Sequence, residues 1–329
     1  MMAATSENTM QVEKNPPKSP DKKKTKYDVI IIGAGPAGYT AGIYCARARH
    51  DTLILSGILP GGQLVNTTDV ENYPGFAEAI LGPDLMIVMR KQTEKMGATI
   101  IDDEAVDVDF THKPFKVLTA SEEYEARAII ICTGADYRKL GLEGEKTFAG
   151  KGVSYCATCD GAFFRNQELI VAGGGDSAME EATFLTKFAS TVHVVHRRDK
   201  LRASKIMQER AMANPKIKFH WNKEIEAISG NQKVQSVTLK DTRTNEKTTL
   251  NVGGVFVAIG HVPSSKIFQN QIELDKNGYI VLKNNTETSV KGVFAAGDVH
   301  DHTYKQAVTA AGFGCMAAID VDRYLTENS

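Results

Sequence analysis

The chain has 329 residues, of which 42% are hydrophobic and 24% charged, and its formal net charge is −1 at pH 7. This composition is typical of a water-soluble globular protein, and the length favours two domains of ordinary size. The small net charge gives no indication of a nucleic-acid or membrane partner, and the longest apolar runs, such as "DVIII" and "GGVFVAIG", are far shorter than the roughly 18 residues of a membrane span. We therefore expect neither partner, and we expect a cytoplasmic location.

Residues 1–26 are polar and rich in proline and lysine. Such a segment cannot bury enough apolar surface to offset the entropy lost on ordering, so the sequence predicts a disordered tail. It lacks the apolar stretch of a secretory signal, and its acidic residues without arginine fit an organelle transit peptide poorly. The run "KKKTK" is either a weak basic targeting signal or, as we favour, part of a solubilising tail.

A first nucleotide-binding unit is predicted from Tyr27 onward. In "YDVIIIGAGPAGYTAGIYCARA" an apolar strand leads into a glycine-rich turn and an alanine-rich helix, which is the context that the dinucleotide fingerprint requires. The glycines permit a tight turn, close approach of a pyrophosphate and close packing of helix on strand, while amide groups at the helix start bind the negative charge. The predicted turn residues are Gly33, Gly35, Pro36, Ala37 and Gly38.

The second strand of this unit departs from the fingerprint. A carboxylate about 20 residues after the turn normally binds the adenosine ribose. Here the strand reads "DTLILSG", and Ser56 stands where the carboxylate is expected. The ribose contact must therefore come from a hydroxyl, the backbone or water.

A polar loop follows, "GGQLVNTTDVENYPG", from Gly61 to Gly75. Its glycines let the backbone pass close to a flat ring, and Gln63, Asn66 and Thr67 offer hydrogen-bond partners. By itself it is an ordinary polar loop. Beside a dinucleotide site that faces the nicotinamide-binding unit described below, a flavin is the expected occupant.

The sequence contains five cysteines, and Cys45, Cys132 and Cys315 lie among apolar or small residues, as inert core cysteines do. Cys156 and Cys159 form a CxxC motif. A zinc site would need a second such pair or suitably spaced histidines, which the sequence lacks, so no metal is expected. A structural bridge would close a very small loop and gain little in a reducing compartment.

A redox dithiol fits this pair better, because a CxxC motif can lower the pKa of a thiol and exchange with another disulfide. Asp160 follows Cys159 directly. It is either a proton donor or acceptor for the pair, or a cap of the following segment.

A second strand–glycine turn–helix pattern begins at Asn166, "NQELIVAGGGDSAMEEATFLTKFA", and its turn fits G-x-G-x-x-A. The next strand ends in a histidine and a cluster of arginines. Cations there accommodate the 2′-phosphate of NADP, whereas a carboxylate would favour NAD; a solvated basic helix start is the alternative. The residues predicted to bind NADPH are Gly173, Gly175, Asp176, Ser177, Ala178, His196, Arg197, Arg198 and Arg202, with Ile259 and Gly260 from the later turn phrase "VGGVFVAIGH".

The C-terminal stretch from "NGYIVLKNN" onward contains a strand, the turn "AAGD" and an alanine-rich amphipathic helix, which is too short for a domain. It either completes the first unit, as we favour, or extends the second. The predicted fold is therefore α/β, with two Rossmann-like nucleotide-binding domains, the second inserted into the first. Their predicted limits are 27–136 with 266–329, and 137–265.

In order along the chain, "GAGPAGYTA", "GGQL", "CATCDG", "GGGDSAMEEA", "HRRDKLRA", "FVAIGH" and "GVFAAGDV" resemble the low-molecular-weight thioredoxin reductases. The resemblance extends from about Tyr27 to the C-terminus. It implies FAD in the discontinuous domain, NADPH in the inserted domain, a homodimer, and thioredoxin as substrate.

The same resemblance assigns further residues to FAD, with Asp298 on the ribitol hydroxyls and Gln306 at the ring edge. One position departs from the family, which commonly has arginine where this chain has Lys305, and lysine cannot make a forked contact. Besides the first turn, the residues assigned to FAD are Ser56, Gly61, Gly62, Gln63, Leu64, Asn72, Gly134, Gly297, Asp298, Lys305, Gln306 and Ala307.

The predicted chemistry poses a problem of geometry, because reacting atoms must come within about 3–3.5 Å. The dithiol and the NADPH site belong to one domain and must both reach one flavin. We therefore predict that the inserted domain swings on linkers near Thr133–Arg138 and Gly260–Ser265. In one pose Cys159, which the family places nearest the flavin, accepts electrons; in the other NADPH reaches the flavin and Cys156 is exposed to thioredoxin.

Three other functions stay open from the sequence. A flavoprotein of this fold could serve a ferredoxin, flavodoxin or peroxidase partner, although the CxxC motif and the lack of a fused thioredoxin-like domain argue against these. A small-molecule dithiol oxidase and a non-catalytic NADP-sensing module are the others. The predicted function is NADPH-dependent reduction of thioredoxin through FAD and the Cys156–Cys159 pair.

Overall fold

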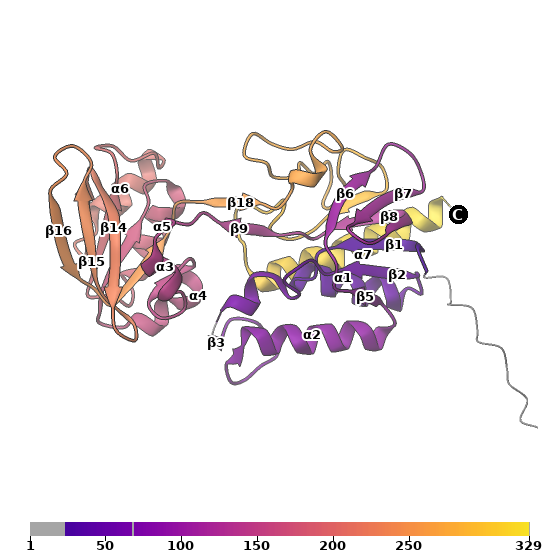
Figure 1. Cartoon of the computed structure of the whole chain (residues 1–329), viewed down its shortest axis with the longest axis horizontal. Coiled ribbons are helices and arrows are strands. Elements are labelled where there is room, and N and C mark those ends of the chain that lie inside the picture. The colour runs from indigo at the N-terminus through magenta and orange to yellow at the C-terminus, as the bar shows by residue number, and fades with distance from the viewer. Residues whose placement is uncertain (1–23, 68, 329) are drawn as a thin grey trace, which may run out of the picture.

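The computed structural model describes residues 24–67 and 69–328. Most of the predicted N-terminal tail lies outside these residues, and the first strand already begins at Lys26. Figure 1 shows two units joined by a pair of extended segments. The first unit carries the long C-terminal helix, and the second carries most of the middle of the chain. The predicted α/β class is confirmed, whereas the exact domain limits stay a prediction.

The first unit is built on a seven-stranded sheet in the order β5-β2-β1-β8-β7-β6, with β19 also paired to β8. Strands β5, β2, β1, β8 and β19 run parallel, whereas β7 pairs antiparallel with both β8 and β6. The strands are β1 (Lys26–Ile32), β2 (Thr52–Leu55), β5 (Thr99–Ile101), β6 (Ala105–Asp109), β7 (Phe115–Thr119), β8 (Glu123–Ile131) and β19 (Val293–Ala295).

Both faces of this sheet are covered, which explains why β1 reads as a continuous apolar run. Val29 and Ile31 point to one face, where helices α1 (Pro36–Arg47), α2 (Gly82–Met96) and α7 (Ala307–Glu327) pack. Ile30 and Ile32 point to the other, where residues of β6, β7 and the 268–299 segment pack. The glycine turn after β1 is thereby held between two cores.

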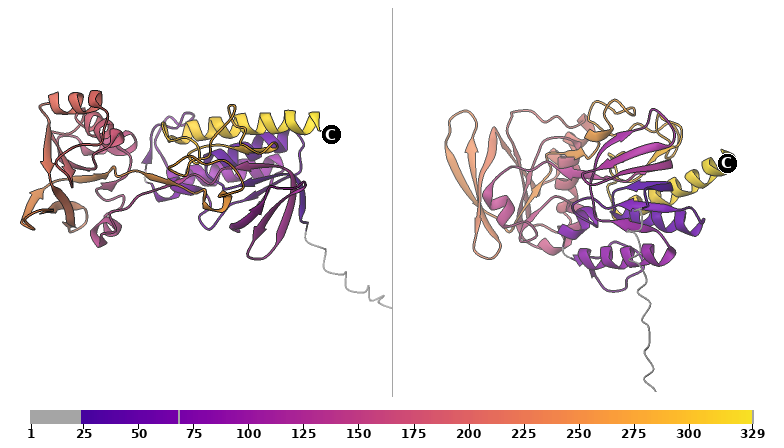
Figure 2. Two further views of the ribbon diagram at one scale, coloured as in Figure 1. Left: turned by 90° about the horizontal axis from the view of Figure 1, so that it is seen from above. Right: turned by 45° about the vertical axis from the view of Figure 1, so that its right-hand side comes forward.

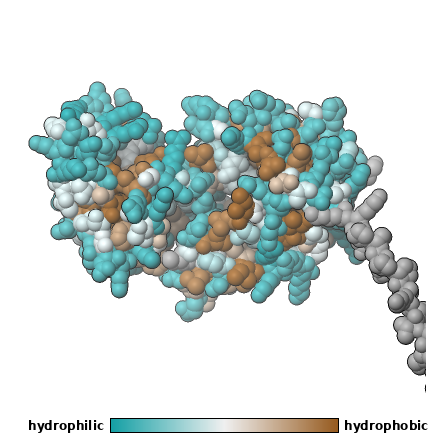
Figure 3. Space-filling view, viewed as in Figure 1, coloured by the Kyte–Doolittle hydropathy of each residue, from teal (hydrophilic) through white to brown (hydrophobic). Residues whose placement is uncertain are grey.

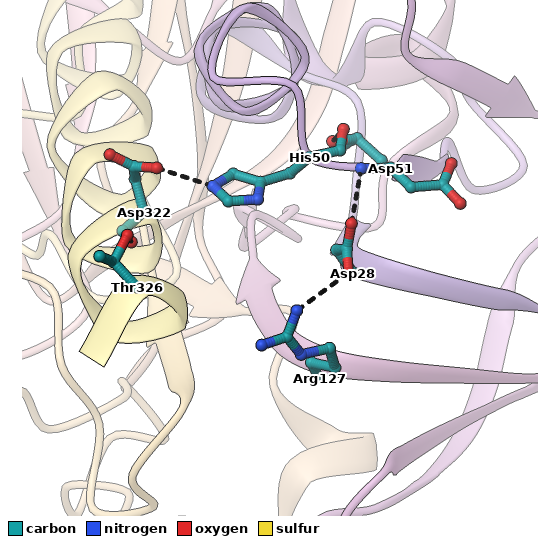
Figure 4. A network of polar contacts seen from close by, with 7 residues as sticks. Asp28, His50, Asp51, Arg127, Asp322 and Thr326 are labelled. Atoms are coloured by element: carbon teal, nitrogen blue, oxygen red, sulfur yellow. Dashed lines mark hydrogen bonds and ion pairs between the residues drawn. The ribbon is translucent and has the colours of Figure 1, made fainter. Parts of the chain in front are cut away.

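The C-terminal stretch returns to this first sheet. Val293 of β19 lies in register with Ile129 of β8, and α7 lies along the unit in every view (Figures 1 and 2). Figure 4 shows the polar contacts that fix its far end: His50 Nε2 lies 2.8 Å from Asp322 Oδ1 of α7. Asp28 accepts a bond from the backbone N–H of Asp51, next to that histidine.

The second unit contains a parallel five-stranded sheet in the order β10-β17-β11-β12-β13 and an antiparallel sheet β14-β15-β16. One face of the parallel sheet packs on helices and the other on the antiparallel sheet. The strands are β10 (Val153–Ser154), β11 (Glu168–Ala172), β12 (Thr191–His196), β13 (Ile217–Trp221), β14 (Lys223–Gly230), β15 (Val234–Asp241), β16 (Lys247–Asn251) and β17 (Gly254–Val257). The helices are α3 (Glu143–Thr147), α4 (Ala157–Asp160), α5 (Asp176–Leu185) and α6 (Lys205–Ala213).

The two units are joined by β9 (Ala135–Tyr137) and β18 (His261–Pro263), which pair antiparallel, with Val262 opposite Asp136 (Figure 1). The remaining short elements are β3 (Asp69–Val70), β4 (Ile80–Leu81) and the 3-10 turns η1 (Gly62–Asn66), η2 (Gly161–Phe164) and η3 (Lys266–Phe268). Within residues 24–67 and 69–328, we find no helix that is long and apolar enough to cross a membrane.

The close contact between α1 and α7 depends on a glycine. A Cβ atom added at Gly314 would lie 2.2 Å from the carbonyl oxygen of Ala37, in the helix that follows the glycine turn. We expect Gly314→Ala to lower the free energy of unfolding by about 1–3 kcal/mol, because overpacking a tight contact costs energy in that range. Chemical denaturation followed by circular dichroism measures the change.

Gly312 provides the matched control on the same helix, since an added Cβ would meet nothing within 4 Å. Gly312→Ala should be neutral or stabilise by up to about 1 kcal/mol, because alanine is the better helix former. Equal destabilisation by both substitutions would contradict the packing argument.

Candidate active site

A cavity of about 820 Å³ lies where the first unit meets the second. Its walls come from the turn after β1, the segments after β2 and β8, the loop around η1 and the start of α7. Thr158, Cys159 and Ala162 close it from the second unit. This volume lies within the range typical of sites for small molecules and cofactors.

The glycine turn after β1 has the shape that the fingerprint predicts. Gly33 has a φ of 106°, and an added Cβ would lie 2.3 Å from the Cys132 carbonyl oxygen, so only glycine fits. Gly35 has nothing within 4 Å of an added Cβ and lines the cavity. Since no side chain caps α1, its first amide groups are free to bind a ligand anion.

Most residues predicted for the flavin site meet at this one cavity. Gly38 and Gly61 do not line it: a Cβ at Gly38 would lie 1.9 Å from the Gly33 carbonyl oxygen, and Gly61 donates its N–H to the Ala34 carbonyl, so both shape the wall from behind. The predicted residues that line the cavity are Gly33, Gly35, Pro36, Ala37, Ser56, Gly62, Gln63, Leu64, Asn72, Gly134, Gly297, Asp298, Lys305, Gln306 and Ala307.

The polar residues of the wall that no sequence motif indicated include Thr133, Glu104 and Lys266. Thr133 donates to the Ser264 carbonyl at 2.6 Å, and its place in the phrase "CTGA" could have pointed to it. Glu104 and Lys266 follow β5 and Ser265 without any motif, and only the folding of these segments brings them to the cavity.

The start of α7 carries the polar groups at the far wall. Burial raises the pKa of Asp298 to about 6, with Asp301 adding to the effect. Gln306 accepts a bond from Asn72 Nδ2 at 3.3 Å, which joins two predicted flavin residues. Lys305 donates from Nζ to the His302 carbonyl at 3.0 Å, a single contact where arginine would offer a fork.

The CxxC pair lies at the junction of the units. Cys156 and Cys159 form a disulfide, and Cys159 lines the cavity whereas Cys156 does not. Cys156 caps α4, and its Sγ accepts a bond from the Cys159 backbone N–H at 3.2 Å. The structure therefore gives the two sulfurs different surroundings, one toward the cavity and one away from it.

Asp160 is held beside this pair. Ser154 donates from Oγ to Asp160 Oδ2 at 2.6 Å, while Oδ1 is inaccessible and has no partner among the described residues. Burial raises the pKa of Asp160, and the Ser154 bond opposes this. The Asp160 side chain makes no cap bond to the 3-10 turn that follows, which argues against the capping alternative. Ser154, which the sequence analysis missed, also accepts a bond from the Cys156 N–H.

The second glycine turn lies away from the cavity, since none of its residues lines it. A Cβ at Gly173 would lie 2.4 Å from the Ala258 carbonyl oxygen, whereas Gly175 is open. Asp176 accepts bonds from the N–H and Oγ of Ser204, which fixes the helix start against the loop after β12. Gly260, with a φ of 107°, accepts at its carbonyl from the Arg138 N–H in the linker.

The basic residues after β12 differ in how far they are exposed to solvent. Arg197, Arg198 and Arg202 are exposed and have no carboxylate partner in the part of the chain that the structure describes. His196 is buried instead, its Nε2 lies 2.9 Å from the Lys200 carbonyl oxygen, and burial lowers its pKa. The structure thus brings the three arginines together at the surface and places the histidine beneath the turn.

Comparison with known proteins agrees with this geometry. The sequence profile of the pyridine nucleotide-disulphide oxidoreductase family matches residues 27–314. A thioredoxin reductase of Streptomyces clavuligerus is 55% identical over 302 residues, which cover 91% of this chain and 94% of the relative. One of Mycolicibacterium smegmatis is 54% identical over 305 residues, covering 92% and 98%. The chain belongs to the thioredoxin reductases of this family.

Solved thioredoxin reductases share the fold. That of Giardia duodenalis superposes with a TM-score of 0.88 at 44% identity, covering 92% of this chain and all of the other. One of Lactococcus lactis, titled as the FR conformation, gives a TM-score of 0.63 at 43% identity, with coverage of 92% and 99%. As a member of this family the chain is an oxidoreductase with a redox-active disulfide that uses a flavin and a nicotinamide nucleotide.

The junction of the two units also contains a carboxyl group without a partner. Glu181 of α5 has an inaccessible Oε2 with no hydrogen bond among the described residues. Burial raises its pKa to about 8 from 4.5, and the nearby Lys305, which belongs to the first unit, opposes this. The surroundings of Glu181 therefore favour its protonated form at neutral pH.

We expect the arrangement of the two units to shift with pH. Between about pH 5 and 8, separation of the units lets Glu181 ionise, so raising the pH disfavours the arrangement seen here by up to about tenfold per pH unit. Energy transfer between dyes on the two units measures this shift. Glu181→Gln should abolish the dependence and Glu180→Gln, at the exposed neighbouring residue, should keep it; the reverse result would contradict the assignment.

Proposed function

We propose that this chain reduces the disulfide of thioredoxin with electrons from NADPH, and that FAD and the Cys156–Cys159 pair carry them between the two. The observation that carries this proposal is that Cys159 lines the same cavity as the first glycine turn. The relatives at 54–55% identity, which are thioredoxin reductases, support it.

FAD is proposed as the ligand of this cavity because polar groups of the lining suit the pyrophosphate, the ribitol and the flavin ring of FAD. The free amide groups around Gly35 suit a pyrophosphate. Asp298 and Gln306 offer polar groups for the ribitol and the ring edge, as the family resemblance implies. When bound, FAD supplies a carrier that accepts two electrons from a nicotinamide and passes them to a disulfide.

The two cysteines are proposed to have different roles. Once the pair is reduced, Cys156 attacks a sulfur of the thioredoxin disulfide as thiolate, and a mixed disulfide forms. Cys159 then displaces the thioredoxin sulfur, which closes the Cys156–Cys159 bond and releases thioredoxin with two thiols. Asp160, whose raised pKa keeps it protonated to higher pH, supplies or accepts a proton at these sulfurs.

NADPH is proposed for the second unit. Its glycine turn opens α5 as the fingerprint requires, and the exposed cluster Arg197, Arg198 and Arg202 offers forked donors for a 2′-phosphate. A carboxylate at this position would have favoured NAD.

A swing of the second unit is proposed because the second glycine turn lies away from the cavity that the disulfide reaches. The β9–β18 ribbon, whose two strands lie within the two predicted linkers, is a narrow connection between the units (Figure 1). Two solved relatives of nearly equal identity, 44% and 43%, give TM-scores of 0.88 and 0.63, which supports more than one arrangement of units in this family.

The predicted domain limits, 27–136 with 266–329 and 137–265, pass through or beside β9 and β18, and we keep them as a proposal. A homodimer is also proposed. Figure 3 shows apolar side chains over the α2 side of the first unit, where Ile87 and Val88 are about half exposed, and such a patch suits a second copy. A cytoplasmic location is proposed from the cysteine usage.

The function is tested by thioredoxin reduction in the presence of NADPH or NADH. Wild-type protein should prefer NADPH, and Cys156→Ser should lose more than about 10³-fold in turnover, because the attacking sulfur is removed. Cys315→Ser, at a cysteine outside the site, serves as the control. Retained activity in the Cys156 variant would contradict the proposed role of the pair.

The proton role of Asp160 predicts a pH effect. Asp160→Asn should lower turnover with thioredoxin by about 10²-fold or more. Since the Ser154 bond lowers the pKa of Asp160, Ser154→Ala should raise it and move the alkaline fall of activity to higher pH. The pH profile of kcat/KM measures both effects; an unmoved profile in Ser154→Ala would count against Asp160 as the titrating acid.

A further inference from the structure

Ser56 stands directly after β2, where the fingerprint places the carboxylate that binds the adenosine ribose. Its side chain is 4% exposed and it lines the cavity beside the glycine turn. A neutral hydroxyl is a weaker acceptor than a carboxylate. Another negatively charged group is therefore needed if this end of the cavity is to bind the adenosine ribose as strongly as the usual carboxylate does.

A carboxylate reaches this point from the neighbouring strand. Strands β2 and β5 are parallel, with Leu55 in register with Ile101, so their carboxyl ends meet at one edge of the sheet. Asp102 follows β5 as Ser56 follows β2. Ser56 donates from Oγ to Asp102 Oδ1 at 2.7 Å, while the Ser56 N–H donates to the Ile101 carbonyl at 3.0 Å.

Asp102 is itself fixed by a third element. Arg90 of α2 donates from Nη1 to Oδ1 at 2.7 Å and from Nη2 to Oδ2 at 3.1 Å, a forked contact. Arg90 is in turn held by Glu94, one helical turn further along, at 3.1 Å. These bonds lower the pKa of Asp102, so that it is a carboxylate at neutral pH.

We infer that Asp102 replaces the missing strand-end carboxylate by acting through Ser56. A serine hydroxyl has one proton and two lone pairs. Because Asp102 takes the proton, Ser56 Oγ turns its lone pairs to the cavity as an acceptor for a ribose hydroxyl, strengthened by the charge behind it. Asp102 does not line the cavity and is therefore a positioning residue. This inference rests on the proposed function, in which FAD occupies the cavity.

Glu104 is the competing carboxylate, since it lies two residues further on and does line the cavity. Both carboxylates are exposed, but the Glu104 side chain makes no hydrogen bond or ion pair among the described residues, whereas Asp102 bonds to Ser56 and Arg90. The Ser56–Asp102–Arg90 contacts are already in place before a ligand arrives, and binding to a preorganised group loses less entropy. The geometry favours Asp102 for this reason.

The test is the dissociation constant of FAD, measured by fluorescence titration of wild-type apoprotein and its variants. We expect Asp102→Asn to weaken FAD binding by about tenfold, the scale of one hydrogen bond to a charged group. Ser56→Ala should weaken it similarly, and the double variant should lose no more than either single one, because both remove one contact. Glu104→Gln, which removes the competing carboxylate, should weaken FAD binding less than Asp102→Asn does.

Two FAD analogues, lacking the 2′- or the 3′-hydroxyl of the adenosine ribose, separate this role from a merely structural one. One of the two analogues lacks the hydroxyl that Ser56 contacts. Wild type, Asp102→Asn and Ser56→Ala should all bind this analogue with the same dissociation constant. The inference is overturned if Asp102→Asn and Ser56→Ala weaken the binding of FAD and of both analogues by the same factor. It is also overturned if these two variants bind FAD as tightly as wild type does.

Two further outcomes are decisive. If Glu104→Gln weakens FAD but not the deoxy analogue, the contact belongs to Glu104 and the inference fails. If the wild-type apoprotein does not bind FAD at all, the proposed function fails and this inference with it. Should Asp102→Asn not fold, Ser56→Ala with the two analogues decides by the same comparison.

Discussion

The architecture is governed by a requirement of distance, since groups that exchange electrons by chemical contact must meet within a few ångströms. In the arrangement seen here, Cys159 of the disulfide lines the cavity from the second unit. The second glycine turn does not line this cavity, and we propose that it reaches the cavity only in another arrangement of the units. In the part of the chain that the structure describes, the two units are connected through β9 and β18.

The two glycine turns solve the same packing problem in each unit. At Gly33 and Gly173 a side chain would collide with a carbonyl of the adjacent strand, whereas Gly35 and Gly175 face open space. The backbone can therefore come close to a phosphate while the helix stays close to its strand. What differs is the next strand end, which carries Ser56 in the first unit and three exposed arginines in the second.

Partly buried carboxyl groups lie near the junction of the units. Asp160, Glu181 and Asp298 come from three separate segments, and burial raises the pKa of each. Such groups are costly to leave charged in a poorly hydrated place. Their protonation therefore depends on how far water reaches each of them, and we expect this to change for Glu181 when the units separate.

The sequence by itself determined the α/β class, the two fingerprints and the redox pair, because glycine spacing, strand periodicity and a CxxC motif are local patterns. It also pointed to many residues of the cavity wall, partly through the family resemblance. Only the tertiary structure decided that Cys159 rather than the second glycine turn faces the cavity, and that Ser154 contacts Asp160. It alone joined Asp102 to Ser56, since these residues are distant in sequence and meet only because β2 and β5 end at the same edge of one sheet.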